Sequence, residues 1–286
     1  MFPRSLDRLR TASRVRTCSA APGRRLGTAR GRSTDFADYR KYDPGDDLRY
    51  VDWSIYKRTG KLFSRQFRAE ADLDLHILLD TSRSMRFGVP DKLDYAKKLA
   101  LALAYVGLNG MDRVALATFG SKLRSSVSPE RGGQQLYKLQ RLLDEAGAEG
   151  DSDFDAALEG YAARAERGGF VIVVSDFFSP QGCEQGLRRL AQGKLELALV
   201  HVLAPQEVRP DFGSDVALED IEAPAGTRMP LDVRALERYR ENLENYLEKL
   251  ESLCLENGSK YVRIETSTPF EGAVRQLLLS GVWEIR

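Results

Sequence analysis

The residues best suited to chemistry are an aspartate and two serines at alternate positions, Asp80, Ser82 and Ser84. They follow a short apolar run, residues 75–79, whose length and composition are typical of a strand buried on both faces of a parallel sheet. Their side chains offer only hard oxygen donors, which suit Mg²⁺, because that cation takes about six oxygen ligands near 2.1 Å. The residues alone leave an alternative open, a turn of the Asx type that caps the next helix.

Two further segments strengthen the case for a site. A second apolar run, residues 171–174, ends in Asp176, and Ser152 lies in an acidic cluster that opens a helix between the two runs. In an open α/β sheet, ligands collect beyond the carboxyl ends of the strands. We therefore expect Asp80 and Asp176 at the same edge of one parallel sheet, within reach of Ser152.

This three-part pattern resembles the metal-ion-dependent adhesion site of von Willebrand factor A domains. The resemblance implies Mg²⁺ or another divalent cation as cofactor. The ligand set that it implies is Asp80, Ser82, Ser84, Ser152 and Asp176. The family usually has threonine where this chain has Ser152, which keeps the hydroxyl. Arg83 lies between the two serines, where it would either compete with the cation or face an acidic partner.

The composition fits a soluble globular protein of one large domain, or of one domain with an extension. The chain has 286 residues, of which 42% are hydrophobic and 30% are charged, and this suffices for a real core. No run approaches the roughly 18 apolar residues that a membrane span needs. The three cysteines are scattered and odd in number, so we expect them to be reduced and the protein to be cytoplasmic.

Charge is distributed unevenly along the chain. Residues 1–32 hold nine basic residues and one acidic residue, which leaves 34 basic and 41 acidic residues, a net charge of −7, for the remainder. The basic segment superficially matches a transit peptide, and it lacks the interleaved aromatic residues that stack on bases. We therefore expect no specific binding of nucleic acid, and interpret residues 1–30 as a flexible arm lying on the acidic body.

The next segment, residues 31–70, combines aromatic residues with charges of both signs. A strong turn is expected at residues 43–46, Asp-Pro-Gly-Asp, and the polar and apolar residues alternate over 61–68 as in an edge strand. Pairs of arginine and carboxylate are expected to hold the segment together. The segment is predicted to pack on the domain that follows, residues 71–286.

The same segment resembles a bacterial family of unknown function, domain-of-unknown-function fifty-eight, which is von Willebrand factor A-like. The matching residues are Asp35-Phe36, Tyr39-Arg40, Tyr42, Pro44-Gly45-Asp46-Asp47, Arg49 and Asp52-Trp53, followed by Leu79-Asp80, Ser82 and Ser84. Members of the family typically accompany AAA+ ATPases of the MoxR type. The resemblance thus implies such an ATPase, with a protein client, as partners. Many relatives have membrane helices before this segment, and the present chain resembles the short soluble form.

The alternation of strands and helices predicts an α/β fold, a doubly wound and mostly parallel sheet with helices on both faces. Strands are expected at 113–119, 195–203 and 261–264, and helices at 91–109, 134–143, 154–165, 181–191 and 270–279. A small hairpin is expected near residues 214–228. The long helix predicted at 231–257 carries an apolar stripe that either packs on the sheet or forms a dimer seam.

Common catalytic signatures are missing from the sequence, which has neither a P-loop, nor Gly-x-Ser-x-Gly, nor His-Glu-x-x-His. The two histidines, His76 and His201, lie in apolar strands and are expected to have structural roles. We therefore predict a non-catalytic, metal-dependent adaptor that binds an acidic side chain of its partner. The alternatives are a Mg²⁺-dependent phosphate ester hydrolase and a scaffold that assembles through the stripe of the long helix.

Overall fold

The computed structural model describes residues 36–43, 48–67, 74–164, 168–179, 182–192, 195–210, 217–219, 228–230 and 233–282. These form two compact units, with residues 36–67 in the smaller and residues 74–282 in the larger. The basic arm and most of the predicted turn at 43–46 lie outside the described residues. The packing of the two units on one another stays a prediction.

The smaller unit is a two-stranded antiparallel sheet with a short helix. Its elements are β1 (Phe36–Lys41), a 3-10 turn (Leu48–Tyr50), α2 (Trp53–Thr59) and β2 (Phe63–Phe67). The buried Asp52 caps α2, since its Oδ1 accepts from the backbone N–H groups of Ser54 (2.9 Å) and Ile55 (3.1 Å). Its Oδ2 accepts from the Tyr39 hydroxyl (3.1 Å). Arg40 forms an exposed ion pair with Asp43 (3.6 Å) in the same unit, a kind of contact that contributes little to stability.

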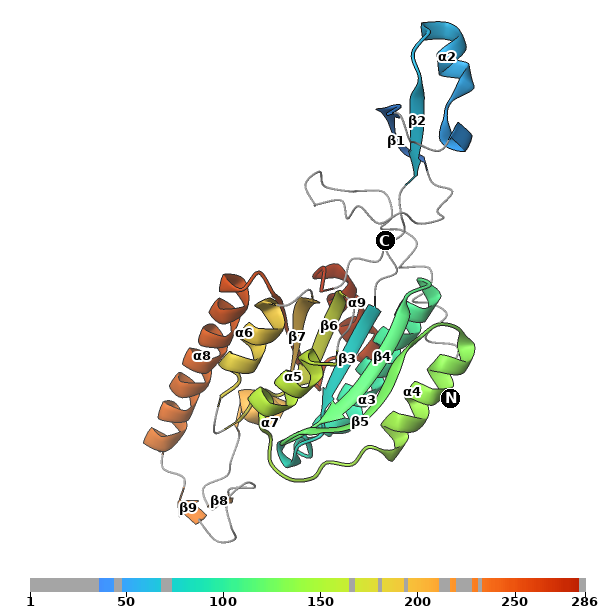
Figure 1. Ribbon diagram of the computed structural model, residues 1–286. Coiled ribbons are helices and arrows are strands. Elements are labelled where there is room, and N and C mark those ends of the chain that lie inside the picture. The colour runs from blue at the N-terminus through green and yellow to red at the C-terminus, as the bar shows by residue number, and fades with distance from the viewer. Residues whose placement is uncertain are drawn as a thin grey trace. The chain divides into compact units, whose positions relative to one another are not determined.

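The larger unit is built on a six-stranded sheet in the order β10-β7-β6-β3-β4-β5 (Figure 1). The strands are β3 (Asp74–Asp80), β4 (Arg113–Phe119), β5 (Leu123–Glu130), β6 (Gly169–Ser175), β7 (Leu195–Leu203) and β10 (Lys260–Glu265). Every pairing is parallel except that of β5 with β4. The predicted doubly wound, mostly parallel sheet is therefore confirmed, and the antiparallel edge strand β5 is an addition to it.

The central position of β3 explains its composition. All seven of its residues are buried, because helices cover both faces of the sheet at this point. Its neighbour β6 begins at Gly169, opposite Asp74. A Cβ atom at Gly169 would lie 2.0 Å from the Asp74 carbonyl oxygen, so this close approach of the two strands requires glycine.

Helices pack on both faces of the sheet (Figure 1). Their bounds are α3 (Lys92–Asn109), α4 (Gly133–Glu145), α5 (Phe154–Ala162), α6 (Glu184–Gln192), α7 (Pro205–Val208), α8 (Val233–Glu256) and α9 (Phe270–Leu279). One apolar core lies under α3, α4 and α9, and a second lies under α5, α6 and α8. This arrangement leaves the carboxyl ends of the parallel strands, and the loops that follow them, at one edge of the sheet.

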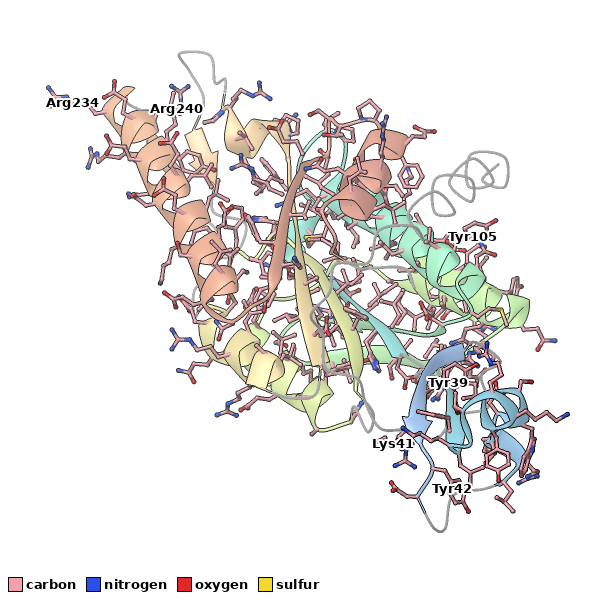
Figure 2. The ribbon with its side chains drawn as sticks, turned by 90° about the horizontal axis from the view of Figure 1, so that it is seen from above. Tyr39, Lys41, Tyr42, Tyr105, Arg234 and Arg240 are labelled. Carbon is pink, nitrogen blue, oxygen red and sulfur yellow. The ribbon has the colours of Figure 1, made fainter. Side chains whose placement is uncertain are left out.

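The long helix α8 uses its apolar stripe within the chain. Leu243, Leu247, Leu250 and Leu253 are buried against the body, so the interpretation of the stripe as a packing surface is confirmed. Arg234 and Arg240 project from its amino-terminal half in Figure 2, where both are exposed. Near the hairpin predicted at 214–228, β8 (Ala217–Glu219) pairs antiparallel with β9 (Arg228–Pro230).

Two of the three cysteines fall within the described residues. Cys183 and Cys254 are buried free thiols, and burial raises the pKa of each to about 12. They are therefore unreactive core residues. Among the helices that the structure describes, none combines the length and the apolar character needed to cross a bilayer.

Candidate metal site at the edge of the sheet

Asp80 is the centre of the first loop. It is the last residue of β3 and is fully buried. Its Oδ1 accepts from the Ser82 backbone N–H (2.8 Å) and its Oδ2 accepts from the Ser175 hydroxyl (2.6 Å). The hydroxyls of Ser82 and Ser84 lie 3.0 Å apart. The spacing Asp-x-Ser-x-Ser thus gathers one carboxylate and two hydroxyls in a single tight loop.

The third loop meets the first because β6 is the parallel neighbour of β3. Ser175 ends β6 and donates to Asp80, and the next residue, Asp176, is also fully buried. Oδ1 of Asp176 accepts from the Phe178 backbone N–H (3.1 Å). The two aspartates are close enough for the charge of Asp176 to raise the pKa of Asp80.

Backbone hydrogen bonds attach the second loop to the first. The Arg83 N–H donates to the Gly150 carbonyl (2.8 Å), and the Glu149 N–H donates to the Thr81 carbonyl (3.0 Å). Ser152 is buried, and its hydroxyl donates to the Phe178 carbonyl of the third loop (3.3 Å). The structure therefore brings all five predicted residues to one edge, with Ser152 facing the third loop.

An aromatic residue in an unusual conformation supports the third loop. Phe177 has a positive φ of 56°, a conformation that costs a residue other than glycine about 1 kcal/mol or more. Its buried ring stacks on Phe154 with a centroid distance of 5.5 Å and meets His201 edge-on at 5.4 Å. The Tyr246 hydroxyl of α8 donates to its carbonyl. These contacts fix the backbone that directly follows Asp176.

Electrostatics at Asp80 indicate a shortage of positive charge. Burial, and then the charge of Asp176, raise its pKa from 3.8 to about 7, against the opposing effect of the hydrogen bonds from Ser175 and Ser82. A bound cation would relieve this cost. The donors fit a hard divalent cation, because they are two carboxylates and three hydroxyls. Among the described residues, no cluster of three or more histidine, cysteine, aspartate or glutamate side chains is arranged to hold a metal.

Sequence reasoning missed two residues of the site, Lys92 and Glu207. Lys92 is fully buried, and its Nζ donates to Asp176 Oδ2 (2.7 Å) and to Glu207 Oε1. Asp91 caps α3, so Lys92 is the first residue of that helix. A lysine there is unfavourable beside the positive end of the helix dipole. The position of Lys92 at the start of the helix was therefore the one signal in the sequence that this lysine has a buried acidic partner.

The two histidines each use one ring nitrogen. Nδ1 of His76 lies 2.7 Å from the Tyr161 hydroxyl, and Nδ1 of His201 lies 2.8 Å from the Tyr261 hydroxyl. Both Nε2 atoms are buried without a hydrogen-bond partner among the described residues. His201 also packs on Phe177, so its structural role extends to the third loop.

The neutral His201 ring should make the chain sensitive to acid. Burial, and then the nearby Lys92 charge, lower its pKa from 6.5 to about 3. The unfolded chain takes up a proton below about pH 6.5 and the folded chain does not, so His201 should cost about 2 kcal/mol of stability between pH 6.5 and pH 5. Urea unfolding in EDTA at both pH values should show a smaller loss for His201→Phe than for wild type. An equal loss in the two proteins would contradict the prediction.

Comparison with known proteins identifies relatives of unknown function. The family described as "Protein of unknown function DUF58" matches residues 38–248. The uncharacterised protein Rv1480 of Mycobacterium tuberculosis is 30% identical over 207 residues, which cover 70% of this chain and 65% of that protein. The uncharacterised protein Mb1516 of Mycobacterium bovis matches at the same identity and coverage. The present chain thus spans about two thirds of the length of these relatives.

Solved structures with a related arrangement share little sequence. An aerotolerance-related membrane protein from Bacteroides fragilis is 19% identical, with a TM-score of 0.47, over 71% of this chain and 97% of that one. The VWA domain of SpRpn10 is 11% identical, with a TM-score of 0.44, over 74% of this chain and 97% of that one. The match to the family over most of the chain, together with the mycobacterial relatives, gives the assignment: this protein is a member of the DUF58 family.

Proposed function

We propose that this protein is a non-catalytic interaction module that binds a divalent cation, Mg²⁺ or a similar ion, at the edge of its sheet. Asp80, Ser82, Ser84, Ser152 and Asp176 would hold the cation. The observation that carries the proposal is the convergence of three loops on two buried carboxylates, in a place where the pKa of Asp80 is raised. When bound, the cation would supply an open coordination position for an oxygen of another protein.

The donor set suits binding better than catalysis. Serine hydroxyls bring no negative charge, so a cation held mainly by hydroxyls keeps its attraction for a carboxylate of a partner. Arg83 is exposed on the same loop and adds a positive charge for that carboxylate. We propose an aspartate or glutamate of a protein partner as the ligand that completes the site.

The partner that we propose is an AAA+ ATPase of the MoxR type, acting in the cytoplasm on a protein client that is matured or remodelled. The resemblance of residues 31–70 to the family hallmark supports this choice, because members of the family typically accompany such ATPases. In this scheme the present chain has no turnover of its own and connects the ATPase with its client.

Addition of Mg²⁺ should stabilise the chain. At a concentration about 100 times its Kd, a ligand that binds only the folded state adds about 2.7 kcal/mol. Thermal unfolding after EDTA treatment should therefore show a Mg²⁺-dependent rise in melting temperature for wild type, and none for Asp80→Ala. Asp144→Ala is the matched control, because Asp144 is exposed on α4 and should leave the rise unchanged. Equal rises in all three proteins would refute the cation site.

Partner binding should depend on the same residues. Calorimetry with the MoxR-type ATPase of the same organism should give binding in Mg²⁺ that is lost in EDTA and in Asp80→Ala. Arg83→Glu should weaken partner binding while the Mg²⁺-dependent rise in melting temperature persists. Equal affinity of wild type for the ATPase with and without Mg²⁺ would refute the metal-bridged mechanism. The alternative of an enzyme would be favoured if the protein hydrolysed a phosphate ester in a Mg²⁺-dependent reaction and Asp176→Ala abolished that activity.

A further inference from the structure

A lysine ammonium already lies on one of the proposed cation ligands. Lys92 Nζ is 2.7 Å from Asp176 Oδ2 and is also bonded to Glu207 Oε1. The ammonium lies 5.7 Å from the centre of the Phe87 ring and 5.6 Å from that of Phe178. No part of this side chain is exposed, so the ammonium depends on its two carboxylate partners for stabilisation.

The charges around the lysine do not balance. Two carboxylates, Asp176 and Glu207, bond the single ammonium, which leaves one negative charge uncompensated when both are ionised, and the buried Asp80 beside Asp176 adds a second when it is ionised. Asp80 is bonded by a hydroxyl and a backbone N–H rather than by a cation. The deficit of two charges equals the charge of one divalent cation.

Each oxygen of Asp176 already accepts one hydrogen bond. Oδ2 accepts from Lys92 and Oδ1 accepts from the Phe178 N–H. A cation that takes Oδ2 of Asp176 as a ligand must share that atom with the ammonium or displace it, and a cation on either oxygen is repelled by the nearby ammonium charge. The lysine and the cation therefore compete for the negative charge of one carboxylate.

Glu207 is positioned to receive the displaced ammonium. Its Oε2 accepts from the Ala204 N–H (2.7 Å), and the Tyr239 hydroxyl donates to its backbone carbonyl (3.0 Å). The loop before α3 packs closely on the same segment, since Gly88 is so near Ala204 that a Cβ would lie 2.3 Å from it. Glu207 is thus held beside Lys92 independently of Asp176.

We propose that Lys92 is a built-in competitor for the divalent cation. Without the cation its ammonium bridges Asp176 and Glu207, and when the cation binds, the ammonium is left to Glu207 alone. This inference rests on the cation site proposed above. It makes Lys92 the residue that sets how tightly the edge of the sheet binds a divalent ion.

The test is titration of the full chain with Mn²⁺, with free Mn²⁺ measured by electron paramagnetic resonance. Lys92→Met should bind Mn²⁺ at least about tenfold more tightly than wild type, because the substitution removes the positive charge of the ammonium beside Asp176. Glu207→Gln should bind more weakly than wild type, because the ammonium then depends on Asp176 alone. The matched control is Lys249→Met, since Lys249 forms an exposed ion pair with Glu184 (2.6 Å) on the surface and should leave the affinity unchanged.

The outcomes separate this inference from the proposed function. If wild type binds Mn²⁺ and Lys92→Met binds no more tightly, the competition is refuted while the cation site stands. If neither wild type nor Lys92→Met binds, the cation site itself is refuted, and the competition with it. Should Lys92→Met fail to fold, Glu207→Gln decides alone: weaker binding supports the competition, and equal or tighter binding overturns it.

Discussion

When divalent cations are absent, Asp80→Asn should become more stable relative to wild type as the pH rises from acid to alkaline values. Because the folded state raises the pKa of Asp80 from 3.8 to about 7, it holds a proton that the unfolded state has already lost. Wild-type stability should therefore fall as the pH rises through this window, and Asp80 should contribute about 4 kcal/mol of that fall. The asparagine variant has no proton to lose there.

The measurement is urea unfolding in EDTA from pH 4 to pH 8. The difference in free energy of unfolding between Asp80→Asn and wild type should change by about 4 kcal/mol in favour of the variant over this range. Asp144→Asn, on the exposed face of α4, should follow wild type. Saturating Mg²⁺ should suppress the fall in wild type, since a bound cation favours the ionised carboxylate. Parallel pH profiles for wild type and Asp80→Asn would refute the raised pKa.

Phe154→Ala should destabilise the larger unit by about 3 to 5 kcal/mol, because it deletes a fully buried aromatic side chain and leaves a cavity. The ring of Phe154 lies between Phe119 (centroid distance 5.4 Å) and Phe177 (5.5 Å). Its loss also removes support for the positive φ at Phe177. The gain in stability on adding Mg²⁺ should shrink as well.

Chemical denaturation with and without Mg²⁺ would measure both effects of Phe154→Ala. The matched control is Tyr137→Ala, since Tyr137 is 73% exposed on α4 and its truncation should cost no more than about 0.5 kcal/mol. A loss below about 1 kcal/mol for Phe154→Ala would show that the aromatic stack does not hold the third loop.

The sheet and the three loops could be predicted because their signals are local. Apolar runs the length of a strand end in Asp80 and Asp176, and in parallel strands this places both carboxylates at one edge. The apolar stripe of α8 could also be predicted, because its apolar residues recur at a spacing of three and four residues. Such patterns depend on neighbouring residues only, so one sequence is enough to recognise them.

The features that escaped prediction depend on distant or exceptional contacts. Lys92 and Glu207 are 115 residues apart, and no local pattern pairs them. The strand β5 reads LRSSVSPE and is largely exposed at the edge of the sheet, so it lacks the hydrophobic alternation of a half-buried strand. The left-handed conformation of Phe177 is imposed by its packing partners rather than by its own preference.

The two tyrosines that reach the site from α8 give that helix a role beyond covering the sheet. Tyr239 donates to the Glu207 carbonyl and Tyr246 donates to the Phe177 carbonyl. Their spacing of seven residues, about two turns, puts them on one side of the helix. A single helix therefore hydrogen-bonds both the segment that carries Glu207, the second partner of Lys92, and the segment that follows Asp176. A displacement of α8 along its axis would therefore change both contacts together, which couples the position of the helix to the geometry of the site.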